Sequence, residues 1–207
     1  MEGGYPMLIT QLIKVKKTGL KVFIDEEYAF LLSEDELDKY NLKEGDNITM
    51  ELYEELRDKV VYPRAIQKAL SLLKFMERCE QELRSKLVQE AYPQEVVDRV
   101  IDYVYHYGYL DDKRFASGFV RSRKNRKSKL MIKTELLQKG VARELIDLVL
   151  QEEYEGEESE DAELTAIQKA IAKKTGNPSA LSPEDKQKLI ASLYRKGFDL
   201  SKIKQLL

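Results

Sequence analysis

The feature that most constrains the fold of this sequence is an internal repeat. Three segments align without gaps: LRSKLVQEAYPQEVV (83–97), IKTELLQKGVARELI (132–146) and LIASLYRKGFDLSKI (189–203). In each, two apolar residues four apart precede a small residue, Ala91, Gly140 or Gly197, which an apolar residue follows directly. This pattern predicts a helix, a left-handed residue that ends it, an apolar contact and a second helix. Stacking such units buries the apolar faces that a single unit would expose.

Apolar residues at spacings of three and four continue from Ala65 onward, and this periodicity predicts nine helices in three sets of three. The expected helices span 65–77, 80–91, 94–107, 111–124, 128–139, 142–154, 161–174, 183–196 and 199–207. The corresponding repeats occupy 63–109, 110–156 and 157–207. We therefore predict a mainly α protein built from tandem three-helix repeats.

The first 62 residues have a different composition, which changes near Pro63. Short runs rich in β-branched and aromatic residues predict strands at 9–17, 20–25 and 28–32, with a hairpin turn at Thr18–Gly19. Ser33 followed by Glu36 predicts a capping box and a short helix, and a turn at Gly45–Asp46 leads into another short strand. We expect a small N-terminal α/β module over 1–62.

Composition also limits the compartment and the covalent chemistry. The 207 residues include one cysteine, Cys79, which excludes an intramolecular disulfide and fits a reducing compartment. No apolar run approaches the ~20 residues that cross a bilayer, and the N-terminus lacks the pattern of a signal peptide. These observations predict a soluble cytoplasmic protein, which we expect to be a monomer without contact to membranes.

The stretch YGYLDDKRFA (107–116) could be a catalytic corner or a joint between two helices. It places adjacent carboxylates, Asp111 and Asp112, five residues after His106, the single histidine of the chain. Capping and helix-dipole rules account for every residue: His106 and Gly108 end one helix, and one of the two aspartates caps the next. We favour the joint, in which Tyr109 and Leu110 are buried. Its structural signature comprises Gly108, Tyr109, Leu110, Asp111, Asp112, Arg114 and Phe115.

Other enzyme signatures are missing from the sequence. There is no G-x-x-x-x-G-K-[ST] phosphate-binding loop, and one histidine with one cysteine leave almost no raw material for a zinc site or a Cys/His dyad. No carboxylate cluster with metal-ligand spacing lies on one helix face. We expect no catalytic residue, metal or cofactor.

A basic run is the candidate binding surface. The net charge is only −2, but the segment 121–133 has seven basic residues and no acid, whereas 151–163 has eight acids and no base. The seven are Arg121, Arg123, Lys124, Arg126, Lys127, Lys129 and Lys133. Such a run is often only a solvated helix end. Its segregation in a nearly neutral chain favours contact with phosphates or an acidic protein groove, without base stacking because no aromatic residue interrupts it. The acidic run is expected to be a solvated linker.

Four sequence pieces together carry a family resemblance. GYLDDKRFA (108–116) is preceded by ALSLL (69–73) and RCEQELRSKL (78–87) and followed by LLQKGV (136–141). In this order they resemble the RecX regulatory proteins of bacteria, whose pattern runs A-L-x-L-L, R-x-x-x-E-L-x-x-K-L, G-Y-L-D-D-x-R-F-A and L-x-x-K-G-[VI]. The match is strong over about residues 65–150 and weaker over the rest of the helical part.

The resemblance implies tandem three-helix repeats in an elongated curved array. It also implies a non-enzymatic negative regulator of the RecA recombinase that acts in DNA recombination, DNA repair and the SOS response. Such a protein would bind the groove of the RecA–DNA filament and inhibit ATP hydrolysis, strand exchange and co-protease activity, with weak contact to single- or double-stranded DNA. Two alternatives from the residues stay open: a stand-alone DNA-binding protein with helix-turn-helix-like repeats, and, less favoured, an acid-dependent nuclease.

Overall fold

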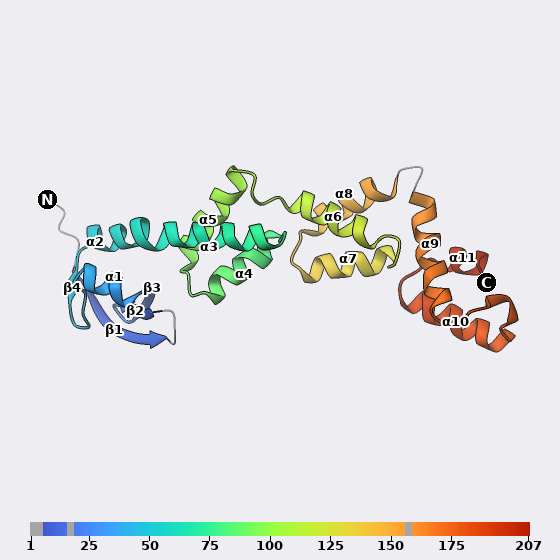
Figure 1. The fold of residues 1–207 in the computed structure, drawn as a ribbon, viewed down its shortest axis with the longest axis horizontal. Coiled ribbons are helices and arrows are strands. Elements are labelled where there is room, and N and C mark those ends of the chain that lie inside the picture. The colour runs from blue at the N-terminus through green and yellow to red at the C-terminus, as the bar shows by residue number, and fades with distance from the viewer. Residues whose placement is uncertain (1–5, 16–18, 156–158) are drawn as a thin grey trace. The chain divides into compact units, whose positions relative to one another are not determined.

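The structure, a computed structural model, describes residues 6–15, 19–155 and 159–207 (Figure 1). It consists of two compact units. The first comprises Met1–Arg78 and Glu82–Leu110, and the second comprises Cys79–Gln81 and Asp111–Leu207. Most of the chain is helical, and the four strands found in the described ranges all lie in the first unit. No helix of those ranges is long and apolar enough to cross a membrane.

The first unit begins with a four-stranded antiparallel sheet, drawn in blue in Figure 1. Its strands are β1 (Met7–Val15), β2 (Gly19–Ile24), β3 (Glu27–Leu32) and β4 (Asn47–Ile48), in the spatial order β3-β2-β1-β4. The predicted strands are thus confirmed to within two residues. The end of the first predicted strand, at 16–17, and Thr18 of the predicted hairpin turn lie outside the described residues.

The short helix α1 (Glu34–Lys39) has the predicted capping box. The Ser33 hydroxyl accepts a hydrogen bond from the Glu36 amide at 3.2 Å, and the Glu36 carboxylate accepts one from the Ser33 amide at 2.7 Å. Arg64 donates to the same carboxylate at 2.8 Å. The cap of α1 is therefore linked to the helix in which Arg64 lies.

That helix begins earlier than the sequence predicted. Helix α2 (Met50–Glu55), a π-helical segment (Leu56–Val61) and α3 (Tyr62–Phe75) follow one another without a break. Pro63 occupies the first turn of α3, where its missing amide and fixed φ are tolerated, so it does not end the helical run. The expected start of the helical part near Ala65 was wrong, because the helical run already begins at Met50. The expected module boundary between residues 62 and 63 falls inside this run.

One hydrophobic core fills the first unit and joins its sheet to its helices. Ile9 and Phe30 of the sheet belong to the same cluster of buried residues as Leu83, Val100 and Leu110. Helices α3, α4 (Glu80–Gln89) and α5 (Gln94–His106) form the first three-helix set. A small α/β module of this size gains stability by sharing a core with adjacent helices.

The second unit contains two further three-helix sets. The first consists of α6 (Asp112–Arg123), α7 (Lys129–Gln138) and α8 (Arg143–Tyr154), and the second of α9 (Ser159–Ala172), α10 (Pro183–Arg195) and α11 (Leu200–Gln205). A short 3-10 helix, Pro178–Ala180, precedes α10. Separate clusters of buried residues fill the two sets. The prediction of a mainly α fold with tandem three-helix sets is confirmed.

The repeated turn has the predicted backbone in all three sets. The residues at its left-handed position, Ala91, Gly140 and Gly197, have φ of 61°, 85° and 80°. The amide that follows each of them donates to the carbonyl of a buried leucine five residues before it, at 3.1–3.4 Å. This is the Schellman arrangement that ends a helix and satisfies its last carbonyls.

The turn of the first set is also contacted by the sheet. The Tyr28 hydroxyl on β3 donates to the Ala91 carbonyl. Burial raises the pKa of Tyr28 to about 12, which keeps this hydroxyl protonated as a donor. Terminal units of helical arrays need a partner for the face that no neighbouring repeat covers, and the strand module supplies one here.

Candidate functional site

The segment with the paired aspartates forms helix ends. Gly108, with φ of 69°, ends α5: its amide donates to the Tyr105 carbonyl and the Tyr109 amide to the Val104 carbonyl, at 3.0 and 2.8 Å. Leu110 is buried as predicted. The Tyr109 side chain is 50% exposed, so the expected burial of this residue was wrong.

Both carboxylates of the pair cap helices. Asp111 is the N-cap of α6 and accepts a hydrogen bond from the Arg114 amide at 2.9 Å. Asp112 accepts one at 2.8 Å from the amide of Glu80, the first residue of α4. The choice left open by the sequence is therefore resolved, with Asp111 as the N-cap and Asp112 capping a second helix. The main-chain contacts of both carboxylates match the joint interpretation.

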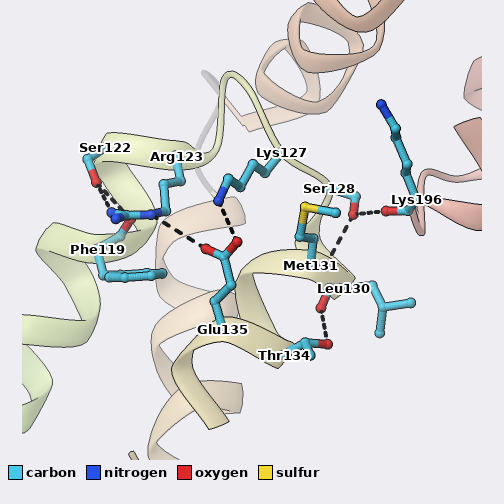
Figure 2. A network of polar contacts seen from close by, with 10 residues as sticks. All are labelled: Phe119, Ser122, Arg123, Lys127, Ser128, Leu130, Met131, Thr134, Glu135 and Lys196. Atoms are coloured by element: carbon cyan, nitrogen blue, oxygen red, sulfur yellow. Dashed lines mark hydrogen bonds and ion pairs between the residues drawn. The ribbon is translucent and has the colours of Figure 1, made fainter. Parts of the chain in front are cut away.

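A pair of contacts joins the start of α7 to the end of α10. Ser128 is buried and caps α7, where its hydroxyl accepts from the Met131 amide at 3.2 Å. The same hydroxyl donates to the Lys196 carbonyl at 2.5 Å (Figure 2). A Cβ atom on Gly197 would lie 2.8 Å from the Leu130 Cβ, closer than real contacts allow. We call this arrangement the Ser128 junction.

The same two contacts occur at the equivalent positions of the preceding repeat. The Cys79 thiol, fully buried just before α4, donates to the Lys139 carbonyl at 3.1 Å. A Cβ atom on Gly140 would lie 2.5 Å from the Gln81 Cγ. We call this arrangement the Cys79 junction. It accounts for the single cysteine as a buried hydrogen-bond donor.

Acids from α7 and α8 pair with four of the seven predicted basic residues, and a fifth, Lys124, bonds to a main-chain carbonyl of α8. Arg121 pairs with Glu153 at 2.7 Å, Lys133 pairs with Asp147, and Lys124 donates to the Glu153 carbonyl at 3.3 Å. The hydrogen bond from Lys133 lowers the pKa of Asp147, which keeps this partner ionised. The run contains no acid in sequence, but the fold supplies acids from the next two helices.

Arg123 and Lys127 share one carboxylate (Figure 2). Lys127 pairs with Glu135, and the Arg123 guanidinium lies 3.6 Å from the same carboxylate and 3.5 Å from the centroid of the Phe119 ring. The Arg123 side chain is thus held by an ion pair and a cation–π contact. Lys129 lies 5.3 Å from the Tyr154 ring.

Unlike the other six predicted basic residues, Arg126 makes no side-chain ion pair, hydrogen bond or cation–π contact with any described residue, and it is exposed. It lines a cleft of about 860 Å³ beside the Ser128 junction, which we call the basic cleft. The cations that line the basic cleft are Arg126, Lys127, Lys169, Lys173, Lys174 and Lys196.

The sequence prediction included only two of these six. The other four come from the end of α9, from the residues directly after it, and from the end of α10. Lys169 and Lys173, four residues apart, were a usable signal because this spacing places two side chains on one helix face. The signal was weak because lysines near a helix C-terminus are commonly explained by the helix dipole.

The chemistry available to this surface is electrostatic. Lysine ammonium groups act as point charges toward phosphate and carboxylate groups, and guanidinium groups add directional hydrogen bonds. In the described part of the chain, no three His, Cys, Asp or Glu side chains gather in a way that could hold a metal ion. The fold and this surface together define a helical-repeat protein with a cationic cleft.

The family follows from sequence comparison. Models of the first, second and third three-helix domains of RecX match residues 65–103, 111–150 and 161–207. The matched segments cover more than half of the chain. The chain therefore belongs to the RecX family, and the resemblance in its sequence motifs is confirmed.

Similar curated proteins carry the name "Regulatory protein RecX". The protein of Caldanaerobacter subterraneus subsp. tengcongensis is 31% identical over 97% of this chain and 98% of its own length. That of Clostridium acetobutylicum is 27% identical over 94% of this chain and 91% of its own length. The family is therefore one of regulatory proteins.

Two crystal structures have a similar fold. One, of regulatory protein RecX, has a TM-score of 0.61 at 23% identity and covers 96% of this chain and 97% of its own. The other, of RecX from Lactobacillus salivarius, has a TM-score of 0.57 at 21% identity and covers 70% of this chain and 92% of its own. At these identities the likeness supports the fold.

Proposed function

We propose that this protein is a non-enzymatic negative regulator of the RecA recombinase. It binds as a monomer in the groove of the RecA–DNA filament and inhibits ATP hydrolysis, strand exchange and co-protease activity. It acts in the cytoplasm, in DNA recombination, repair and the SOS response. Contact with RecA dominates, and contact with DNA is weak.

Membership of a family of regulatory proteins is the observation that carries this proposal. The signature carboxylates support the non-enzymatic part, because Asp111 and Asp112 accept main-chain hydrogen bonds and hold helix ends. The unpaired Arg126 and the lysines of the basic cleft offer positive charge to a filament that contains DNA.

The test is ATP hydrolysis by RecA on single-stranded DNA, measured with increasing amounts of this protein. We expect hydrolysis to fall as the protein is added. Undiminished hydrolysis at a large excess of folded protein would contradict the proposal.

The predicted basic run is tested by the double substitution Arg121→Glu with Arg126→Glu. Arg121 would then repel Glu153, and Arg126 would carry negative charge into the basic cleft. We expect weaker inhibition with an unchanged circular dichroism spectrum. The matched control is Arg143→Glu with Arg195→Glu, which changes the same charge at two exposed arginines that do not line the basic cleft. Equal inhibition by both variants would remove the run from the mechanism.

The alternative function is a stand-alone DNA-binding protein. The basic cleft favours it, because a concentration of lysines needs no protein partner to attract DNA. Tight DNA binding with steep salt dependence in the absence of RecA, together with unaffected RecA hydrolysis, would support this alternative over the regulatory function.

A further inference from the structure

The basic cleft is a site that the sequence did not predict as a unit. Its walls come from the loop before α7, the end of α9 and the end of α10, all within the second unit. The Ser128 junction holds two of these walls together, because the buried Ser128 hydroxyl bonds the start of α7 to the Lys196 carbonyl. Two walls of the cleft are therefore joined by a hydrogen bond from a buried side chain to the main chain.

The charge of the cleft is almost entirely uncompensated. None of its lining residues is an acid. Arg126, Lys169 and Lys173 are exposed and form no ion pair with the described residues, and Lys174 donates to the neutral Ser192 hydroxyl at 2.6 Å. Lys127 is the one lining cation paired with a described acid, Glu135. Several like charges held around one cleft repel each other, and an anionic ligand relieves this repulsion.

The kind of cation points to phosphates. Five of the six are lysines, which bind phosphate as point charges, whereas carboxylates of acidic proteins are recognised best by arginine forks, of which the cleft has one. The aromatic residue in the lining, Phe198, is buried and offers no face on which a base could stack. The lining can therefore contact a sugar-phosphate backbone but is not equipped to recognise bases.

Lys169 and Lys173 give the cleft a direction. Lys169 lies in the last turn of α9 and Lys173 directly after it, with the Lys173 amide donating to the Lys169 carbonyl at 3.2 Å; four residues correspond to about 6 Å along a helix axis. Two ammonium groups in a row along one wall, with Arg126 on another wall, suit a ligand with repeated charges better than a single small anion.

We propose that the basic cleft binds the phosphodiester backbone of DNA without sequence preference. This proposal specifies the weak DNA contact of the proposed function and depends on that function in no other respect. It assigns the contact to Arg126, Lys169 and Lys173, and not to the paired bases Arg121, Arg123 and Lys133. Binding requires no RecA, so the test below fails or succeeds independently of any effect on RecA.

The test is fluorescence anisotropy in the absence of RecA, with a labelled oligothymidylate of about 30 nucleotides and, separately, a duplex of the same length. The variant Arg126→Gln/Lys169→Gln/Lys173→Gln removes three exposed cations of the cleft. The control Arg143→Gln/Lys188→Gln/Lys204→Gln removes one arginine and two lysines, also exposed, that do not line it. Circular dichroism melting verifies that both variants fold.

We expect the cleft variant to bind either DNA about tenfold more weakly at low salt and the control to bind within about twofold of the unsubstituted protein. For the single strand, the slope of log K against log salt should decrease in magnitude by about 2, since three contacts contribute about 0.7 each. The charge-preserving variant Arg126→Lys/Lys169→Arg/Lys173→Arg should retain the affinity.

Equal affinities of the cleft variant and the control would overturn the proposal, as would loss of affinity in the charge-preserving variant. Poly-L-glutamate serves as the competing acidic polymer. If the cleft bound it more tightly than the oligothymidylate at equal charge concentration, the ligand would be an acidic protein segment and the DNA assignment would be wrong.

Discussion

The Cys79 junction and the Ser128 junction are built alike and differ in their surroundings. In each, a buried side chain at the start of one helix donates to the last carbonyl before a left-handed glycine, at 3.1 Å from Cys79 and 2.5 Å from Ser128. In each, the glycine lies against the second residue of the helix, with no space for a Cβ atom. The geometry of the repeat is thus set by a small side-chain donor and a glycine.

The charge beside the two junctions is not repeated. Arg126 and Lys127 precede the Ser128 junction, whereas the equivalent positions before the Cys79 junction are Glu77 and Arg78. The basic cleft borders Ser128, Lys196 and Phe198. The repeated residues specify the fold, while the positive charge of the basic cleft comes from residues that the repeats do not share.

The largest expected effect is on stability, from Gly197→Ala. A Cβ atom there would clash with Leu130, and the left-handed backbone adds strain, so the free energy of unfolding should fall by about 2 to 3 kcal/mol. Gly108→Ala is the control, because Gly108 is also left-handed but a Cβ atom on it would meet no atom within 4 Å, and it should lose only about 1 kcal/mol. Urea unfolding measures both. Equal losses of unfolding free energy in the two variants would mean that the close approach of Gly197 to Leu130 does not affect stability.

Ser128→Ala should lower the free energy of unfolding by about 2 kcal/mol. It removes the cap of α7 and leaves the Lys196 carbonyl without the donor that the buried Ser128 supplies. Ser182→Ala removes a similar cap from α10 at an exposed position and should lose about 1 kcal/mol. If thermal melting showed equal losses of stability in the two variants, the hydrogen bond from Ser128 to the Lys196 carbonyl would not contribute to stability.

Glu135→Gln should increase the net positive charge beside the Ser128 junction and leave the charge beside the Cys79 junction unchanged. It removes the carboxylate that pairs with Lys127 and Arg123, so that Lys127 adds its full charge to the basic cleft. We expect the affinity for oligothymidylate at low salt to rise about threefold. Glu144→Gln removes one exposed acid of α8 and should leave the affinity unchanged. A weaker affinity of Glu135→Gln would contradict the assignment of Lys127 to the cleft.

The smallest effect is expected from Cys79→Ser, which gives the Cys79 junction the donor of the Ser128 junction. A hydroxyl is a stronger donor than a thiol, and this gain offsets the greater penalty for burying it, so stability should change by less than about 0.5 kcal/mol. Cys79→Val has no donor and should lose about 1 to 2 kcal/mol. Chemical denaturation of both variants checks the difference. A large loss in Cys79→Ser would show that the two junctions are not equivalent.

Much of the fold could be predicted from the sequence, because periodicity and turn residues act locally. Ala91, Gly140 and Gly197 fixed three helix ends, and Ser33 with Glu36 fixed a capping box. The start of the helical part could not be predicted so well. Pro63 favours the first turn of a helix as well as the end of one, and only the π-helical segment before it decides between these.

The candidate site was harder to predict because charge partners are far apart in the sequence. Arg121 meets Glu153 across 32 positions and Lys133 meets Asp147 across 14. With Arg123 and Lys127, which meet Glu135, four of the seven predicted bases are thus paired with acids. Conversely, Arg126 and Lys173 line one cleft although helices α7, α8 and α9 lie between them in the sequence. Only the packing of the helices determines which charges meet.

The central claim, binding to the RecA–DNA filament, is tested most directly by co-sedimentation with RecA filaments on single-stranded DNA across a salt series. We predict that the protein pellets with the filaments at low salt, and that it still does so at salt concentrations that abolish its binding to DNA alone, because contact with RecA dominates. Protein that stays in the supernatant at every salt concentration, or pellets only as much as it does with DNA lacking RecA, would contradict the account.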